Sequence, residues 1–99
     1  MSEIDIQRQD SAQGGRYLVS RAEGDEVAEL SWHNIGPRMI AADHTYTPPA
    51  MRGTGVAAAM VERLIADARA QGTKILPLCS YVRAQFDRHP DWADLRLQG

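Results

Sequence analysis

The sequence predicts an α+β fold in which a mixed, mostly antiparallel sheet is flanked by helices. Three observations lead to this prediction. Apolar and polar residues alternate through much of the N-terminal half, a long amphipathic stretch follows a glycine-rich turn, and a short apolar run comes after that stretch. Alternation with a period of two is typical of half-buried strands, whereas apolar spacings of three and four residues are typical of helices.

The N-terminal half is predicted to form an antiparallel meander of about four strands. The first strand is expected over residues 3–9, and two more within residues 14–34, on either side of a turn near residues 23–25. The fourth is expected over residues 38–46. The short links favour antiparallel pairing, because a parallel pair needs a much longer crossover.

Residues 56–68 are predicted to form the long helix, with Gly72 just beyond its end. The apolar run at residues 74–82 is then expected to be a buried strand that lies parallel to residues 38–46, joined to them by a right-handed crossover. Pro77 cannot donate to a strand ladder, so we expect the parallel pair to splay apart around it. A short helix over residues 83–88 and a turn over residues 91–95 follow.

Composition excludes several classes of protein. A chain of 99 residues is predicted to form one domain over residues 1–99, and its net charge of -2 argues against nucleic-acid binding. One cysteine, Cys79, allows no internal disulfide, and three dispersed histidines do not have metal-ligand spacing. No apolar region of the secretory kind follows Met1, and no apolar run approaches the roughly 18 residues of a membrane span. A cytoplasmic protein without membrane partners is therefore expected.

A glycine loop precedes the predicted long helix, where residues 52–57 read Arg-Gly-Thr-Gly-Val-Ala. Unpaired N–H groups and the helix dipole make such a start a site for anions. The spacing does not fit the phosphate loop of nucleoside triphosphatases. It satisfies G-x-G-x-x-A superficially, but the dinucleotide motif begins where a strand ends, and here residues 48–52 intervene. A plain tight turn is the structural alternative.

The loop residues Arg52, Gly53, Thr54, Gly55, Val56 and Ala57 resemble the R/Q-x-x-G-x-G/A signature of GNAT-type N-acetyltransferases, which cradles the pyrophosphate of coenzyme A. Together with DHTYTPPAMRGTGVA, ILPLCSYV and RHPDWADL, the chain resembles a small, stand-alone GNAT-like family from Ile4 to Leu97. The resemblance implies a minimal GNAT fold with a splayed parallel strand pair, and acetyl-CoA as the cofactor. It implies further that the amides from Gly53 to Ala57 hold the phosphates and that Arg52 adds charge. The pantetheine arm would then follow the strand edge formed by Thr45, Tyr46 and Thr47.

Two side chains are candidate catalytic residues under this resemblance. Cys79 ends the predicted strand at the gap, where it would form an acetyl-cysteine or act as an acid–base group at the thiolate. A buried, inert thiol is the alternative. His44 is a candidate general base because imidazole titrates near neutral pH. Strict alternation places it on the face of Ile40 and Ala42, however, where a core histidine is equally consistent.

The other polar groups near the gap are assigned as follows. Backbone N–H groups around residues 44–46 would stabilise the oxyanion. Tyr81 would protonate the thiolate, as a tyrosine does in many larger GNAT enzymes, but its predicted place at a strand end argues against this. His33 is expected at the surface, and His89 is expected to be structural beside Pro90.

The resemblance therefore predicts an acetyl-CoA-dependent N-acetyltransferase that acts on an amine, by direct attack or through Cys79. No segment offers the helices that usually build a deep acceptor pocket, so an exposed amine such as a protein lysine suits the cleft. The alternative is a non-catalytic acyl-CoA-binding or protein-interaction module.

Overall fold

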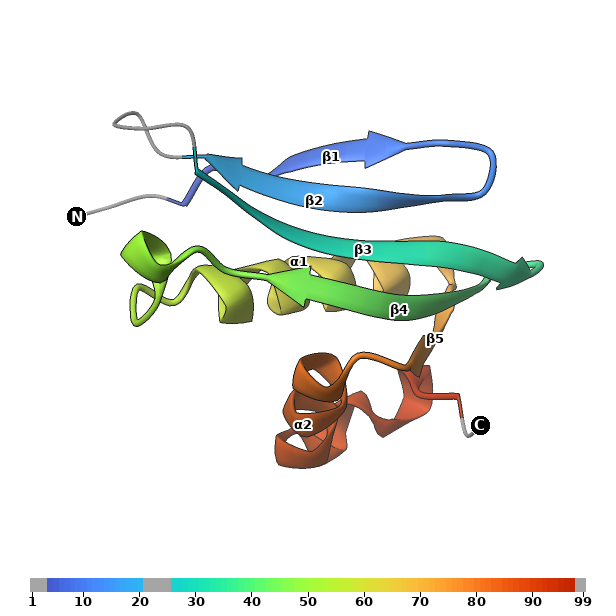
Figure 1. The fold of residues 1–99 in the computed structure, drawn as a ribbon. Helices are drawn as coiled ribbons and strands as arrows, with labels where there is room; N and C mark the ends of the chain where they lie inside the picture. The colour runs from blue at the N-terminus through green and yellow to red at the C-terminus, as the bar shows by residue number, and fades with distance from the viewer. Residues whose placement is uncertain (1–3, 21–25, 98–99) are drawn as a thin grey trace.

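The computed structural model describes residues 4–20 and 26–97. Figure 1 shows the elements in chain order, with α1 lying along one face of the sheet. The elements are β1 (Gln7–Asp10), β2 (Gly14–Ser20), β3 (Val27–Gly36), β4 (Met39–Tyr46), the 3-10 helix η1 (Pro49–Met51), α1 (Val56–Gln71), β5 (Lys74–Pro77), α2 (Ser80–Arg88) and the 3-10 helix η2 (Pro90–Leu95).

The described strands form one mixed sheet in the order β1-β2-β3-β4-β5. The first four make an antiparallel meander, and β5 pairs with β4 in parallel after the crossover through α1. The predicted α+β class and the parallel pair are confirmed. The first strand begins later than predicted, at Gln7, and the turn expected at residues 23–25 lies outside the described residues.

The predicted strand over residues 74–82 is wrong beyond Pro77, where β5 ends. Pro77 is the last β5 residue in register with β4, opposite Ala42. The next two N–H groups, of Leu78 and Cys79, both donate to the Ala42 carbonyl oxygen, at 3.0 and 2.9 Å. The chain then turns into α2 at Ser80. As expected from Pro77, the two strands part here, and β5 leaves the last residues of β4 unpaired on that side.

A β-bulge interrupts β4 at the same point. Ser31 pairs with His44 and Trp32 pairs with Ala42, so Asp43 is an extra residue in β4 with no partner on β3. A bulge shifts the alternation by one residue. The expectation that His44 shares a face with Ala42 is therefore wrong: Ala42 is fully buried and His44 is exposed.

The core lies between the sheet and the helices. The apolar stripe of α1 packs with buried side chains of β2 and β3, among them Tyr17, Leu30 and Trp32. Gly72 ends α1 with a φ of 69°, in the left-handed region that suits glycine, as predicted. In residues 4–20 and 26–97, no helix is both long enough and apolar enough to cross a bilayer.

Candidate functional site

A groove of about 390 Å³ lies at the N-terminus of α1. Its wall combines the end of β4, the turn before α1, the first turn of α1, and Tyr81 of α2. The residues that line it are Thr45, Thr47, Met51, Arg52, Gly53, Gly55, Val56, Ala57, Ala58 and Tyr81. Seven of the nine residues predicted to bind the cofactor are on this wall; the exceptions are Tyr46, which is exposed, and Thr54.

The groove wall carries a run of unpaired backbone donors. The first N–H group of this segment that bonds in the helical pattern belongs to Ala59, which donates to the Gly55 carbonyl oxygen at 2.9 Å. Within the described residues, no acceptor is found for the N–H groups of Gly53, Gly55, Val56, Ala57 and Ala58. Such donors at a helix start, beside the positive end of its dipole, favour an anion. They suit a phosphate or diphosphate group.

Two glycines leave the approach to these donors open. Gly53 and Gly55 have φ values of 80° and 85°, and no atom lies within 4 Å of the position where either would carry a Cβ. Side chains other than glycine rarely adopt this backbone conformation. The loop thus combines a turn that favours glycine with empty space at the two would-be Cβ positions.

Two further loop residues, Arg52 and Thr54, donate hydrogen bonds to nearby backbone carbonyl oxygens. The backbone N–H and the hydroxyl of Thr54 both donate to the Met51 carbonyl oxygen, and Thr54 does not line the groove. Arg52 donates from Nε to the Thr47 carbonyl oxygen at 3.1 Å. This bond ties the guanidinium to the rim of the groove, at the end of β4.

Cys79 lies at the point where β4 and β5 part, directly before α2. Its Sγ is 3.2 Å from the Thr45 Oγ1, and the side chain is half-buried. Thr45 also lines the groove, so this contact joins the groove to the parting of the strands. The predicted placement of Cys79 at the gap holds, although it precedes a helix rather than ending a strand.

The prediction that Tyr81 lies at the end of a strand is wrong. Tyr81 lies in the first turn of α2, not at a strand end, and it contributes to the groove wall. Burial raises the pKa of its hydroxyl, with Arg88 acting in the opposite direction. The hydroxyl is therefore protonated at neutral pH and can donate a proton. Pro77 was the available signal, because a proline at this place ends the strand before Tyr81 is reached.

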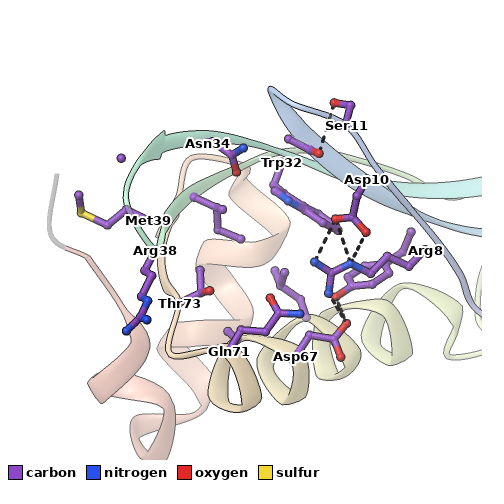
Figure 2. Close-up of a pocket in the computed structure, with 16 residues that line it drawn as sticks. Arg8, Asp10, Ser11, Trp32, Asn34, Arg38, Met39, Asp67, Gln71 and Thr73 are labelled. Carbon is purple, nitrogen blue, oxygen red and sulfur yellow. Dashed lines mark hydrogen bonds and ion pairs between the residues drawn. The ribbon is translucent and has the colours of Figure 1, made fainter.

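A second cavity, of about 290 Å³, lies towards the C-terminal end of α1 (Figure 2). On its wall the Arg8 guanidinium donates to Asp10 and to Asp67, and Asp67 also accepts the Tyr17 hydroxyl at 2.6 Å. Burial and the bond to Asp67 raise the pKa of Tyr17. Burial acts to raise the pKa of Asp67, but hydrogen bonds from Tyr17, Arg63 and Arg8 outweigh it and lower that pKa. The network ties β1 and β2 to α1, and no predicted site residue lines this cavity.

Comparisons with known proteins bear on the fold and the family. The chain resembles the NMR solution structure of a GCN5-like protein from Staphylococcus aureus, with a TM-score of 0.72 and 20% sequence identity. The match covers 100% of this chain and 93% of the other, and at this identity it supports the fold. A family model for GCN5-related N-acetyltransferases matches residues 16–95. Because that model spans most of the sequence, the chain belongs to the GCN5-related N-acetyltransferase family.

Proposed function

We propose that this protein is an acetyl-CoA-dependent N-acetyltransferase that moves an acetyl group to an amine. Membership of the family supports acetyl transfer in general. The observation that supports the cofactor is the row of five unpaired amides, from Gly53 to Ala58 without Thr54, on the wall of a groove that reaches the parting of β4 and β5. We further propose that residues 1–99 act as one domain in the cytoplasm.

The cofactor would be held by backbone atoms more than by side chains. The amides of Gly53, Gly55, Val56 and Ala57 would bind the diphosphate, with Ala58 extending the row. Arg52 adds a positive charge at the rim, and Thr54 holds the turn in shape. The unpaired edge of β4 at residues 45–47 would hydrogen-bond the pantetheine arm as a further strand would.

The residues at the parting of the strands supply the chemistry. When bound, acetyl-CoA supplies the thioester whose carbonyl carbon accepts the attack. Backbone N–H groups around residues 44–46 stabilise negative charge on the carbonyl oxygen. Tyr81, on the groove wall, would donate its proton to the departing thiolate. A general base takes the proton of the amine; the exposed His44 is the candidate that the sequence predicts for this role, and the exposed His33 is a second imidazole on the same sheet.

Two routes of transfer fit this arrangement. The amine attacks the thioester directly, or Cys79 first takes the acetyl group and passes it on. The contact between Cys79 and Thr45 beside the groove supports placing the thiol near the thioester. All helices in the described residues follow β4, so none lies between the early strands to build a deep acceptor pocket there. An exposed amine, such as the lysine of a protein, therefore suits it as an acceptor.

Thermal melts with and without acetyl-CoA test the proposal, followed by an assay of thiol release with amine acceptors. A ligand at 100 times its dissociation constant stabilises a protein by about 2.7 kcal/mol, which a melt detects easily. We expect stabilisation by acetyl-CoA and release of free coenzyme A when an amine is added. Stabilisation without release under any acceptor would identify a non-catalytic acyl-CoA-binding module instead. No stabilisation at millimolar acetyl-CoA would refute the cofactor assignment.

A further inference from the structure

His33 and Asp43 form a hydrogen-bonded pair on the face of the sheet opposite the buried Leu30 and Trp32. The Nδ1 of His33 lies 2.5 Å from Oδ2 of Asp43, and the hydroxyl of Ser31 donates to Oδ1 of Asp43 at 3.1 Å. The His33 side chain is 47% exposed and that of Asp43 is 35% exposed. Both oxygens of the carboxylate are therefore used within the sheet, while the imidazole remains open to solvent on its other side.

The β-bulge is the reason that this pair exists. Asp43 has no partner on β3, because Ser31 pairs with His44 and Trp32 pairs with Ala42. A bulged residue can turn its side chain out of the regular alternation, and bulges often do so beside active sites. Asp43 thus meets Ser31 and His33, two residues that share the exposed face of β3.

The pair is also placed at the parting of the strands. Asp43 directly follows Ala42, whose carbonyl oxygen accepts the last two hydrogen bonds from the β5 side. One residue of strand is about 3.3–3.4 Å of chain. Beyond Ala42 no β5 residue in the described chain pairs with β4, so the edge of β4 beside Asp43, the partner of His33, is open at the parting of the strands.

The hydrogen bond to Asp43 also sets the tautomer of His33. An ionised carboxylate only accepts hydrogen bonds, so Nδ1 of His33 carries the hydrogen and donates it. In the neutral ring, Nε2 is then unprotonated and its lone pair faces solvent. An imidazole held by a carboxylate in this way is fixed in the orientation from which Nε2 can take a proton. For the side chain of His44, by contrast, no hydrogen bond or ion pair is found in the described part of the chain, and His44 joins the sheet through its backbone opposite Ser31.

We propose that His33 is the general base for the acceptor and that Asp43 is its positioning residue. This inference rests on the proposed function. Nε2 of His33 takes a proton from the amine as the amine nitrogen bonds to the acetyl carbonyl carbon and the carbon–sulfur bond breaks. The electron pair of that bond leaves on sulfur, and the thiolate takes a proton from Tyr81 or water. In the route through Cys79, His33 takes the proton of the amine when the amine attacks the acetyl group on Cys79, and the Cys79 thiolate leaves. His44 then borders the acceptor without taking its proton.

Release of coenzyme A thiol from acetyl-CoA, with Nα-acetyl-lysinamide or with water alone as acceptor, tests the assignment. The variants are His33→Ala, Asp43→Asn and His44→Ala, and His89→Ala controls for loss of an imidazole outside the site. His33→Ala should lower kcat by about 10²–10⁴-fold, the usual contribution of a general base, with KM for acetyl-CoA unchanged. Added imidazole should restore part of that rate above the enzyme-free blank. Asp43→Asn should lower kcat by a smaller factor, also without a change in KM.

Each result decides between the alternatives. Wild-type kcat in His33→Ala would overturn the inference, as would a loss that imidazole does not restore. A larger, imidazole-restored loss in His44→Ala would assign the proton to His44 instead. If the wild-type protein binds acetyl-CoA but releases no thiol with either acceptor, the proposed function itself fails, and this inference falls with it.

Discussion

Replacing Gly55 by alanine separates the folding role of the glycine loop from its proposed binding role. Gly55 has a φ of 85°, and no atom lies within 4 Å of its would-be Cβ. The added methyl group meets no neighbour, so the cost to folding is that of the backbone conformation alone. Placing an L-residue in the left-handed region costs about 1–2 kcal/mol. For a domain of this size, that lowers Tm by about 4–16 °C.

The same substitution should also weaken the binding of coenzyme A, and this effect is measured separately from the loss of stability. A methyl group in front of the amides of the first turn keeps a phosphate from reaching them. Loss of one hydrogen bond to a charged group costs about 1.5–3 kcal/mol, which is roughly 10- to 150-fold in Kd for coenzyme A. Calorimetric titration at a temperature well below the Tm of the variant measures this Kd on folded protein.

Gly72→Ala is the matched control. Gly72 also has a positive φ, of 69°, and open space at its Cβ position, but it lies at the other end of α1. It should lose a similar free energy of unfolding and keep the wild-type Kd for coenzyme A. Equal Kd values for Gly55→Ala and the wild-type protein would refute the phosphate-binding role of the loop.

Three further predictions concern single side chains. If transfer runs through Cys79, intact-mass measurement after incubation with acetyl-CoA should show an acetyl adduct on the wild-type protein and none on Cys79→Ala, while acetyl-CoA still stabilises the variant. An adduct that persists in the variant would exclude Cys79 as the carrier, and no adduct on the wild-type protein would leave direct attack or the non-catalytic binding module. Tyr81→Phe should lower kcat by about 10²-fold without changing Tm or KM for acetyl-CoA, because only the proton donor is removed; unchanged kcat would show that solvent protonates the thiolate. Asp67→Asn should lower the free energy of unfolding at pH 7 by about 1.5–3 kcal/mol, through its bonds to Tyr17 and Arg8. Because folding lowers the pKa of Asp67 from 3.8, its stabilisation is present above that pH and is lost as the pH falls through the folded-state pKa. Urea titrations from pH 7 to pH 3 should therefore show a shallower loss in the variant, and parallel curves would count against the network.

The sequence predicted most of the architecture because its strongest signals are local. Alternation and short links gave the meander, helical spacing gave α1, and Gly72 marked its end. Pro77 also predicted the parting of the strands, because a missing N–H group limits a ladder wherever it occurs. The extent of β5 was overestimated, since the apolar residues after Pro77 are compatible with a buried strand or with the apolar face of a helix.

The side of the sheet on which each catalytic candidate lies was harder to predict. The bulge at Asp43 depends on the register between two strands, which no single stretch of sequence specifies. It reversed the expected facing of His44 and brought Asp43 to His33, which composition and spacing had assigned to plain surface. Tyr81 was likewise expected at a strand end, but α2 begins at Ser80 and Tyr81 lines the groove.

The long helix is secured far from the place where it would meet its ligand. Arg8, Tyr17 and Asp67 fasten its later turns to the first two strands, whereas its opening turn offers bare amides to the groove. The contacts that stabilise α1 and the amides proposed to bind the ligand are therefore at opposite ends of the helix. A substitution among Arg8, Tyr17 and Asp67 should therefore loosen the packing of α1 on the first two strands and leave the amides of its first turn in place.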